Sequence, residues 1–223
     1  MTTEKKKVRG KKTRGELRTE ATRKALLTAA RELFAEKGMD LTTIDDITQR
    51  ADVAKGTFYY HFKNKNRLIK ELMRNMLVGL QNNIEAHCRK STDLEGLLDC
   101  LIRSHIDFFS NRWEDFALFF QGRADMILKE GYEGIDVRFI DYLDSIADLF
   151  DAIISYHLDR DSLIRISCAV AGFVSGYYSF AVIATDDDDH FNETLQPVQR
   201  ALVAGLSKFI REATPGNEPT VRW

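Results

Sequence analysis

The sequence predicts an all-α fold. Apolar residues recur three and four positions apart along most of the 223-residue chain, which is the spacing that builds one face of a helix. No segment alternates apolar and polar residues as a half-buried strand does, and no Asn-Gly pair suggests a hairpin. Only three prolines interrupt the chain, and 44% of its residues are hydrophobic, which is enough for a sizeable core.

The first predicted helix starts at Thr19 and follows a strongly basic segment. Residues 1–18 contain almost no apolar side chains, so we expect a disordered arm, which either touches a polyanion or only aids solubility. Leu26 and Leu33 lie on the inward face of the helix that follows. Gly38 stands where a glycine cap would end that helix.

Two short helices come next, at about 43–51 and 55–62, and a tight turn joins them. Thr42 or Thr43 can cap the first helix, since a side-chain oxygen at either position can accept a hydrogen bond from a free backbone N–H. Phe58 and Phe62 are four residues apart and therefore face inward together in the second helix. This pair, braced by the longer helix before it, is a helix-turn-helix, whose second helix enters the major groove of DNA.

The outer face of the second short helix suits contact with double-stranded DNA. Gly56 lets another backbone approach closely, and Thr57 offers a hydroxyl to a phosphate or base and a methyl to thymine. Lys65 begins the next helix, where the positive end of the helix dipole also attracts phosphate. The predicted DNA-binding residues are Thr43, Lys55, Gly56, Thr57, Tyr59, Tyr60, His61, Lys63 and Lys65.

Charge is distributed unevenly between the two ends of the chain. Residues 1–70 hold 18 Lys and Arg against 9 Asp and Glu, whereas residues 71–223 hold 14 against 25. Only the basic part suits a polyanion, which the acidic part would repel. We therefore expect a DNA-binding domain at 19–66, a separate helical domain at 67–214 and a flexible tail at 215–223.

Residues 41–68, LTTIDDITQRADVAKGTFYYHFKNKNRL, resemble the N-terminal motif of the TetR/AcrR family of prokaryotic transcriptional regulators. The likeness extends over about 19–72. It implies a homodimeric repressor on a palindromic operator, with a helical C-terminal domain that holds a ligand pocket and the dimer interface. The matching positions are Thr43, Ile47, Ala51, Val53, Gly56, Thr57, Tyr59, His61, Phe62 and Lys65.

Two positions depart from that motif. Asp52 stands where the turn usually has glycine, and aspartate accepts a left-handed backbone better than most residues. Ala54 stands where serine usually caps the second short helix, and losing such a cap costs on the order of 1 kcal/mol. Neither departure changes the expected fold.

Helical patterns continue towards the C-terminus. The segment from Ile166 to Ala184 contains nineteen residues without a charge, which approaches the length of a membrane span. Its small residues, serines and tyrosines favour a buried helix instead, and we expect no membrane association. The predicted helices lie at about 64–88, 94–110, 112–129, 134–158, 161–185 and 193–213.

An aromatic stripe near 105–120 suggests a pocket for an apolar or aromatic effector, although ordinary core packing explains each ring equally well. His105 and Arg123 would supply polar groups that orient the effector. The candidate pocket residues are His105, Phe109, Trp113, Phe116, Phe120, Arg123, Tyr142, Phe173 and Tyr177.

The resemblance places the dimer interface on the last two helices. Small residues in the helix at 161–185 would let two helices approach closely, although packing within the core also explains them. The candidate interface residues are Ala169, Gly172, Gly176, Val203 and Leu206.

No other chemistry stands out in the sequence. Three scattered cysteines fit neither a disulfide framework nor a thiolate metal cluster, and they suit a reducing cytoplasm. The five histidines lack zinc spacing, and no phosphate-binding loop or catalytic Ser or Cys motif is present. We therefore expect no metal, no cofactor and no enzymatic activity.

Two functional hypotheses follow from these patterns. The first is a DNA-binding repressor that a small apolar or aromatic ligand releases from a palindromic operator. The alternative is a helix-turn-helix regulator that has no small-molecule ligand and is controlled by a protein partner.

Overall fold

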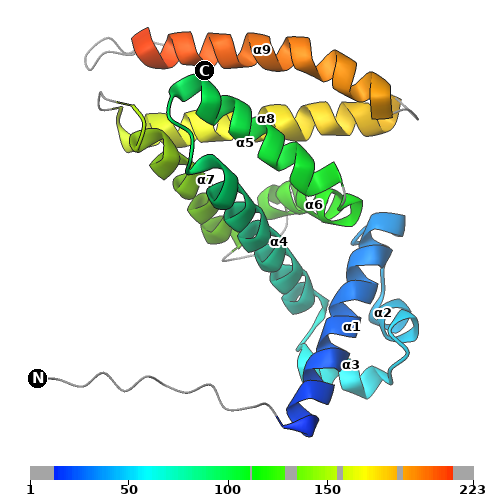
Figure 1. Cartoon of the computed structure of the whole chain (residues 1–223). Coiled ribbons are helices and arrows are strands. Elements are labelled where there is room, and N and C mark those ends of the chain that lie inside the picture. The colour runs from blue at the N-terminus through cyan, green and yellow to red at the C-terminus, as the bar shows by residue number, and fades with distance from the viewer. Residues whose placement is uncertain (1–12, 111, 129–134, 155–157, 185–187, 213–223) are drawn as a thin grey trace, which may run out of the picture. The chain divides into compact units, whose positions relative to one another are not determined.

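The computed structural model describes residues 13–110, 112–128, 135–154, 158–184 and 188–212 (Figure 1). Within these ranges the regular structure is entirely helical, so the predicted all-α fold is confirmed. The predicted tail at 215–223 and most of the predicted arm lie outside the described residues. The helices are α1 (Arg14–Lys37), α2 (Ile44–Arg50), α3 (Lys55–His61), α4 (Lys65–Cys88), α5 (Leu94–Ser110), α6 (Trp113–Leu128), α7 (Ile135–Asp151), α8 (Arg160–Ala184) and α9 (Asp188–Glu212).

The chain divides into two compact units. The N-terminal unit comprises residues 1–69 and the C-terminal unit residues 70–223. The boundary therefore falls inside α4, close to the position between 66 and 67 that the sequence suggested. The N-terminal unit contains the helix-turn-helix, and the C-terminal unit contains the long helices.

α1 begins at Arg14, before the predicted start at Thr19. Thr13 caps it: the Thr13 hydroxyl accepts from the N–H of Glu16 at 3.2 Å, and the Glu16 carboxylate accepts from the N–H of Thr13 at 2.7 Å. This capping box satisfies N–H groups that the first helical turn leaves free. The last residues of the predicted disordered arm are therefore helical, and the predicted end of the arm at residue 18 is wrong. The helix ends as expected at Gly38, whose φ is 86°.

A capping box also begins α2. The Thr43 hydroxyl accepts from the N–H of Asp46 at 3.1 Å, and the Asp46 carboxylate accepts from the N–H of Thr43 at 2.7 Å. In the turn that follows, Asp52 has a φ of 52°, the left-handed backbone that the sequence required there. Ala54 then precedes α3 without any side-chain cap, also as expected.

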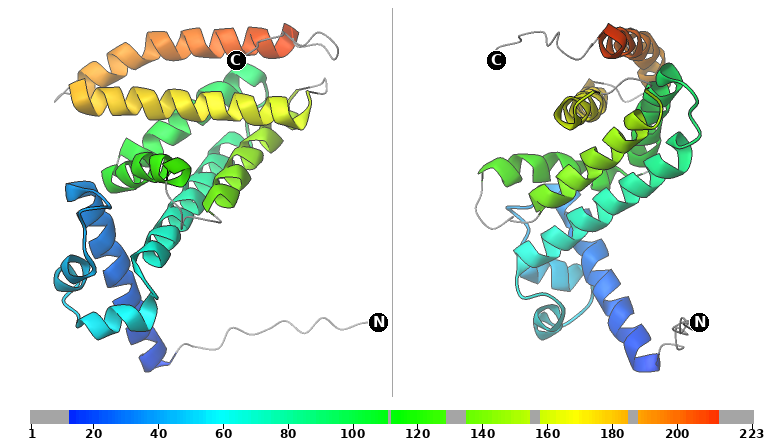
Figure 2. Two further views of the ribbon diagram at one scale, coloured as in Figure 1. Left: turned by 180° about the vertical axis from the view of Figure 1, so that it is seen from behind. Right: turned by 90° about the vertical axis from the view of Figure 1, so that its left-hand side faces the viewer.

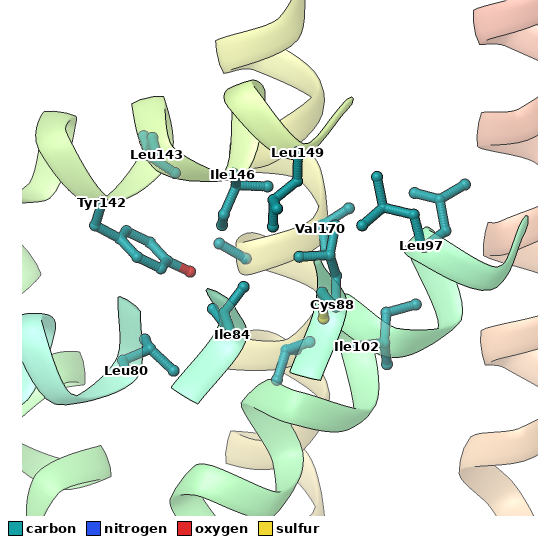
Figure 3. Close-up of a cluster of buried hydrophobic side chains, with 14 of the residues drawn as sticks. Leu80, Ile84, Cys88, Leu97, Ile102, Tyr142, Leu143, Ile146, Leu149 and Val170 are labelled. Atoms are coloured by element: carbon teal, nitrogen blue, oxygen red, sulfur yellow. The ribbon is translucent and has the colours of Figure 1, made fainter. Parts of the chain in front are cut away.

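α5 contacts α6, α7, α8 and α9, so it lies at the centre of the C-terminal unit. α8 and α9 run beside each other in both views (Figures 1 and 2). One apolar cluster fills the space between the helices of this unit (Figure 3). Its labelled members come from four helices and include Ile84 of α4, Leu97 of α5, Ile146 of α7 and Val170 of α8.

Two boundaries in the C-terminal unit differ by several residues from the sequence-based expectation. α7 ends at Asp151, before the predicted end at 158. α9 begins at Asp188, before the predicted start at 193, so Pro197 lies inside the helix and not in its first turn.

The long uncharged run lies in α8, and it is partly buried. Ile166, Val170 and Val174 face the core, whereas Ala169 and Gly176 are exposed. Among the described helices, none is both long and apolar enough to span a membrane.

Candidate nucleic-acid interface

Two phenylalanines anchor α3 to the rest of the N-terminal unit. Phe58 is fully buried and Phe62 is 3% exposed, and their ring centroids lie 5.7 Å apart. The guanidinium of Arg23, on α1, lies over the Phe62 ring at 4.7 Å from its centroid. Phe58 lies inside this seven-residue helix and Phe62 follows directly after it, so the side of α3 opposite Phe58 faces outward.

That outward side carries two large exposed rings. Tyr59 is 52% exposed and Tyr60 is 76% exposed, which is unusual for aromatic side chains without a partner molecule. Lys55 and Gly56 are also exposed, and Thr57 and His61 are half-buried. The structure therefore brings the predicted contacts of α3 together on one surface.

Gly56 is not required by the fold itself. It does not adopt the left-handed backbone that favours glycine, and a Cβ added there would meet no heavy atom of the chain within 4 Å. Neither backbone conformation nor internal packing therefore explains a glycine as the second residue of this short helix. Close approach of another molecule to the backbone of α3 is the remaining physical reason.

Lys65 serves the fold in a way that the sequence did not reveal, and Thr43 makes one hydrogen bond beyond its predicted cap. The Lys65 ammonium donates to the backbone carbonyls of Met39 at 2.8 Å and Thr42 at 2.9 Å, and its side chain is half-buried. It therefore holds the loop between α1 and α2. The Thr43 hydroxyl donates to the Asp46 carboxylate at 2.7 Å in addition to its capping bond. Both groups are already engaged within the chain.

Burial and the nearby positive charge of Arg23 lower the pKa of His61 below its ordinary value. The imidazole is therefore neutral near pH 7, where an unperturbed histidine is already mostly uncharged. His61 can take part in hydrogen bonding or stacking, but it does not add a positive charge to this surface. Its ring packs edge-on against Tyr60, with centroids 5.0 Å apart.

The structure extends this surface to the start of α1, which sequence reasoning missed. A groove of about 380 Å³ runs between the two helices. The sequence pattern assigns Arg18 to the disordered arm and so gives no hint that it lies beside α3. The spacing of Thr13 and Glu16, which is that of a capping box, could have indicated the earlier start of α1. The groove is lined by Arg18, Thr19, Thr22, Gly56, Thr57, Tyr60 and His61.

Ion pairs brace α2 against α1. The Arg50 guanidinium binds both carboxylate oxygens of Glu36 at 2.8 Å each, and it also reaches Glu32 at 3.4 Å. Lys37 lies 2.8 Å from the Asp46 carboxylate. This charge, together with the capping bonds to Thr43, holds the pKa of Asp46 far below its usual range.

The predicted effector residues divide into a buried group and a surface group. His105, Phe109, Phe116 and Tyr142 are all buried in the C-terminal unit. Phe109 packs against Phe116 with ring centroids 5.5 Å apart, and His105 is hydrogen-bonded to Tyr142. These four side chains belong to a continuous network of contacts among α5, α6 and α7, as core residues do.

The other predicted effector residues whose side chains the structure describes are less buried, although they pack against the core or against Phe116. Trp113 is 45% exposed and Phe120 is 53% exposed, so both lie at the edges of the aromatic stripe of α6. Phe173 and Tyr177 are half-buried on α8 and pack against each other with centroids 5.8 Å apart. The side chain of Arg123 lies outside the described residues.

The predicted interface residues also fall into two sets. Ala169 and Gly176 are exposed on α8, Gly172 is half-buried, and a Cβ added at either glycine would meet open space. Val203 and Leu206 of α9 are half-buried against the core instead. Sequence reasoning missed two large apolar side chains that are exposed in the described part of α9, Val198 at 46% and Phe209 at 45%.

Comparison with known proteins finds a family profile that matches most of the N-terminal unit. Residues 26–72 match the profile described as "Bacterial regulatory proteins, tetR family". The regulator YvdT of Bacillus subtilis is 31% identical over 121 residues, which cover 54% of this chain and 62% of YvdT. The TetC protein of transposon Tn10 from Escherichia coli is 35% identical over 91 residues, or 40% of this chain and 44% of TetC. The chain thus spans less than two thirds of the length of these relatives.

The whole fold is shared with solved structures at low sequence identity. PfmR of Thermus thermophilus, a TetR family transcriptional regulator, aligns with a TM-score of 0.63 at 19% identity, over 81% of this chain and 98% of PfmR. FadR of Bacillus subtilis, solved in complex with stearoyl-CoA, aligns with a TM-score of 0.63 at 18% identity, over 82% of this chain and 98% of FadR. Residues 26–72 thus resemble the tetR family of bacterial regulatory proteins, and the chain shares its helical fold with a solved regulator of that family.

Proposed function

We propose that this protein regulates transcription by binding double-stranded DNA through α3. The observation that carries the proposal is the exposed face of α3, where Tyr59 and Tyr60 stand outward while Phe58 fixes the helix from behind. A short helix presented in this way fits the major groove, and tyrosine and threonine side chains contact phosphates and base edges there. The cytoplasm is the compartment in which a bacterial regulator meets its DNA.

The start of α1 supplies a second contact in this proposal. Arg18 and Thr19 border the groove beside α3, and a guanidinium at that place suits a phosphate of the DNA backbone. Contacts of this kind fix the register of the protein on DNA, whereas contacts from α3 to base edges give specificity.

A homodimer on a palindromic operator completes the proposal. Two recognition helices read half-sites about 34–36 Å apart, one turn of DNA, so something must hold two copies at a fixed distance. The outer faces of α8 and α9 suit this task, because Gly172 and Gly176 leave room for a close helix while Val198 and Phe209 offer exposed apolar area. Each subunit would then contribute the same surface.

Control by a small apolar ligand is the finer part of the proposal. FadR, whose fold this chain shares, was solved with stearoyl-CoA, and the C-terminal unit of this chain is rich in aromatic side chains. A ligand of this class would release DNA only if it binds one conformation of the C-terminal unit better than another. Because α4 runs from the N-terminal unit into the C-terminal unit, we propose that it carries that change.

One observation favours the alternative, in which no small molecule binds. Phe109 packs against both Phe116 and Phe119, and both ring nitrogens of His105 have hydrogen-bonding partners. These predicted pocket residues therefore satisfy one another. Thermal unfolding with added stearoyl-CoA, and with CoA as the control, separates ligand control from control by a protein partner. A higher unfolding temperature with stearoyl-CoA alone supports ligand control. An unchanged unfolding temperature supports control by a protein partner.

The function itself is tested by selecting bound sequences from a random duplex library. We expect the selected sequences to share a palindrome whose half-sites are about 10 base pairs apart, or a multiple of that distance. A library that emerges from repeated selection without any shared sequence would contradict specific DNA recognition. Selection with a Thr57→Ala variant provides the control, since the preference should relax while weak binding to all DNA remains.

A further inference from the structure

The N-terminal end of α3 carries an ion pair that the DNA-binding proposal does not use. The ammonium of Lys55 lies 2.7 Å from one carboxylate oxygen of Asp45 and 3.0 Å from the other. Lys55 is the first residue of α3, and Asp45 lies in the first turn of α2. Both side chains are largely exposed, at 56% and 69%.

This pair contributes little to holding the two helices together. Exposed ion pairs are screened by water and salt, and many have no measurable effect on stability. The neighbouring Asp46, by contrast, caps α2 and binds Lys37. The fold therefore gives a reason for a carboxylate at Asp46 but a weak one at Asp45.

At the DNA-facing surface, the same pair has a larger consequence. Lys55 is the one basic residue in the first turn of α3, a turn that also lacks acidic residues. A phosphate that binds the Lys55 ammonium must displace the Asp45 carboxylate or share the ammonium with it. Asp45 also repels any phosphate that comes near, because both carry negative charge.

We propose that Asp45 is a negative determinant of DNA affinity: by occupying Lys55, it weakens the binding of the protein to DNA of any sequence. The inference rests on the proposed function. A carboxylate in this position lowers the sequence-independent part of binding, which comes from phosphate contacts, and leaves the base contacts of α3 unchanged. Specific and non-specific affinity are therefore lowered by the same factor, and the ratio between them stays the same.

The test is a salt titration of binding to a duplex of random sequence, roughly 30 base pairs or three turns of DNA long. Asp45→Asn removes the charge and keeps the shape. We expect binding about two- to fivefold tighter than wild type, the range by which an exposed ion pair shifts an equilibrium. We also expect the slope of log K against log salt to become steeper by up to about 0.9, as one additional phosphate contact requires.

Asp52→Asn is the matched control, since it removes the same charge from an exposed residue of the same unit. Asparagine accepts the φ of 52° at this position. If both variants tighten binding equally, net charge is the cause and the role of Asp45 is refuted. Asp45→Ser serves as a second variant if the asparagine protein folds poorly by circular dichroism.

The link to Lys55 is tested by a double-mutant cycle. In a Lys55→Met background, the additional Asp45→Asn change should tighten binding much less than it does in the wild type. An undiminished effect would show that Asp45 acts on DNA directly and would overturn the inference. A wild-type protein without any salt-dependent DNA binding would refute the proposed function itself, and the inference with it.

Discussion

The Tyr142 hydroxyl on α7 donates a hydrogen bond to Nε2 of His105 on α5, inside the core of the C-terminal unit. Nδ1 of the same imidazole lies 2.6 Å from the Leu101 carbonyl, which can only accept, so Nδ1 carries the proton. The arrangement uses both nitrogens of a neutral ring. Burial lowers the pKa of His105 to about 4, because a charged imidazole would be poorly solvated there.

This buried histidine predicts how stability depends on pH. The pKa of His105 is about 4 in the folded protein, and that of an unfolded histidine is about 6.5. Below pH 6.5 the unfolded chain binds a proton that the folded protein does not, so stability falls between about pH 6.5 and 4, by up to about 1.4 kcal/mol per pH unit. Urea unfolding of wild type and His105→Gln across this window measures the difference, and parallel curves would contradict it.

We expect removal of the Lys65 ammonium to loosen the loop between α1 and α2. Lys65→Ala removes the donors to the carbonyls of Met39 and Thr42, so we expect faster amide hydrogen exchange around the loop between α1 and α2. The exposed Lys63 is the control, because Lys63→Ala should leave exchange unchanged and reduce the salt slope of DNA binding by about 0.9. Unchanged exchange in Lys65→Ala, with a reduced salt slope, would instead make Lys65 a direct phosphate contact.

We expect substitution of Gly56 to have opposite effects on protein stability and on DNA binding. Gly56→Ala should fold at least as well as wild type, because alanine is favoured over glycine within helices by up to about 1 kcal/mol and the new methyl group meets open space. DNA binding should nevertheless fall, since the methyl group occupies the space where DNA approaches α3. Thermal unfolding and a DNA-binding titration on one preparation test both effects, and unimpaired binding would contradict the close approach.

We expect a charge on the outer face of α8 to prevent dimer formation. Gly176→Glu places a charge on the proposed interface, so we expect sedimentation as a monomer at micromolar concentration and weakened operator binding. Asn82→Glu adds the same charge to an exposed residue of α4 and should remain dimeric. The rate at which a thiol reagent labels Cys168 is a second measurement of the dimer. Cys168 is exposed on α8, so a dimer through α8 should slow its labelling and the monomeric variant should be labelled faster. A wild-type protein that sediments as a monomer would contradict the dimer.

The sequence was sufficient wherever neighbouring residues decide the structure. Thr43 and Asp46 cap α2 through bonds three residues apart, and the left-handed turn needs only the backbone preference of Asp52. The inward direction of Phe58 follows from helical spacing in the same way. Local chemistry therefore predicted the helix-turn-helix and the exposed face of α3.

The sequence was insufficient wherever distant residues meet. The carbonyls that hold Lys65 lie 23 and 26 residues before it, so no local pattern could reveal that its ammonium is engaged. Asp45 and Lys55 are ten residues apart on different helices, and their pairing depends on how α2 packs against α3. Helical spacing also identified an aromatic side of α6 without showing that Phe116 and Phe119 are buried while Trp113 is exposed.

Recognition of DNA by α3 is tested most directly by one affinity ratio. The ratio compares a palindrome selected from random DNA with a shuffled duplex of the same composition, at one salt concentration, for wild type and Thr57→Ala. We expect wild type to prefer the palindrome by about 10³ or more, as specific DNA-binding proteins do. Thr57→Ala should lower that ratio by roughly 5- to 150-fold, the equivalent of one lost base contact, while affinity for the shuffled duplex stays nearly constant. Equal ratios in the two proteins would show that α3 does not read the sequence.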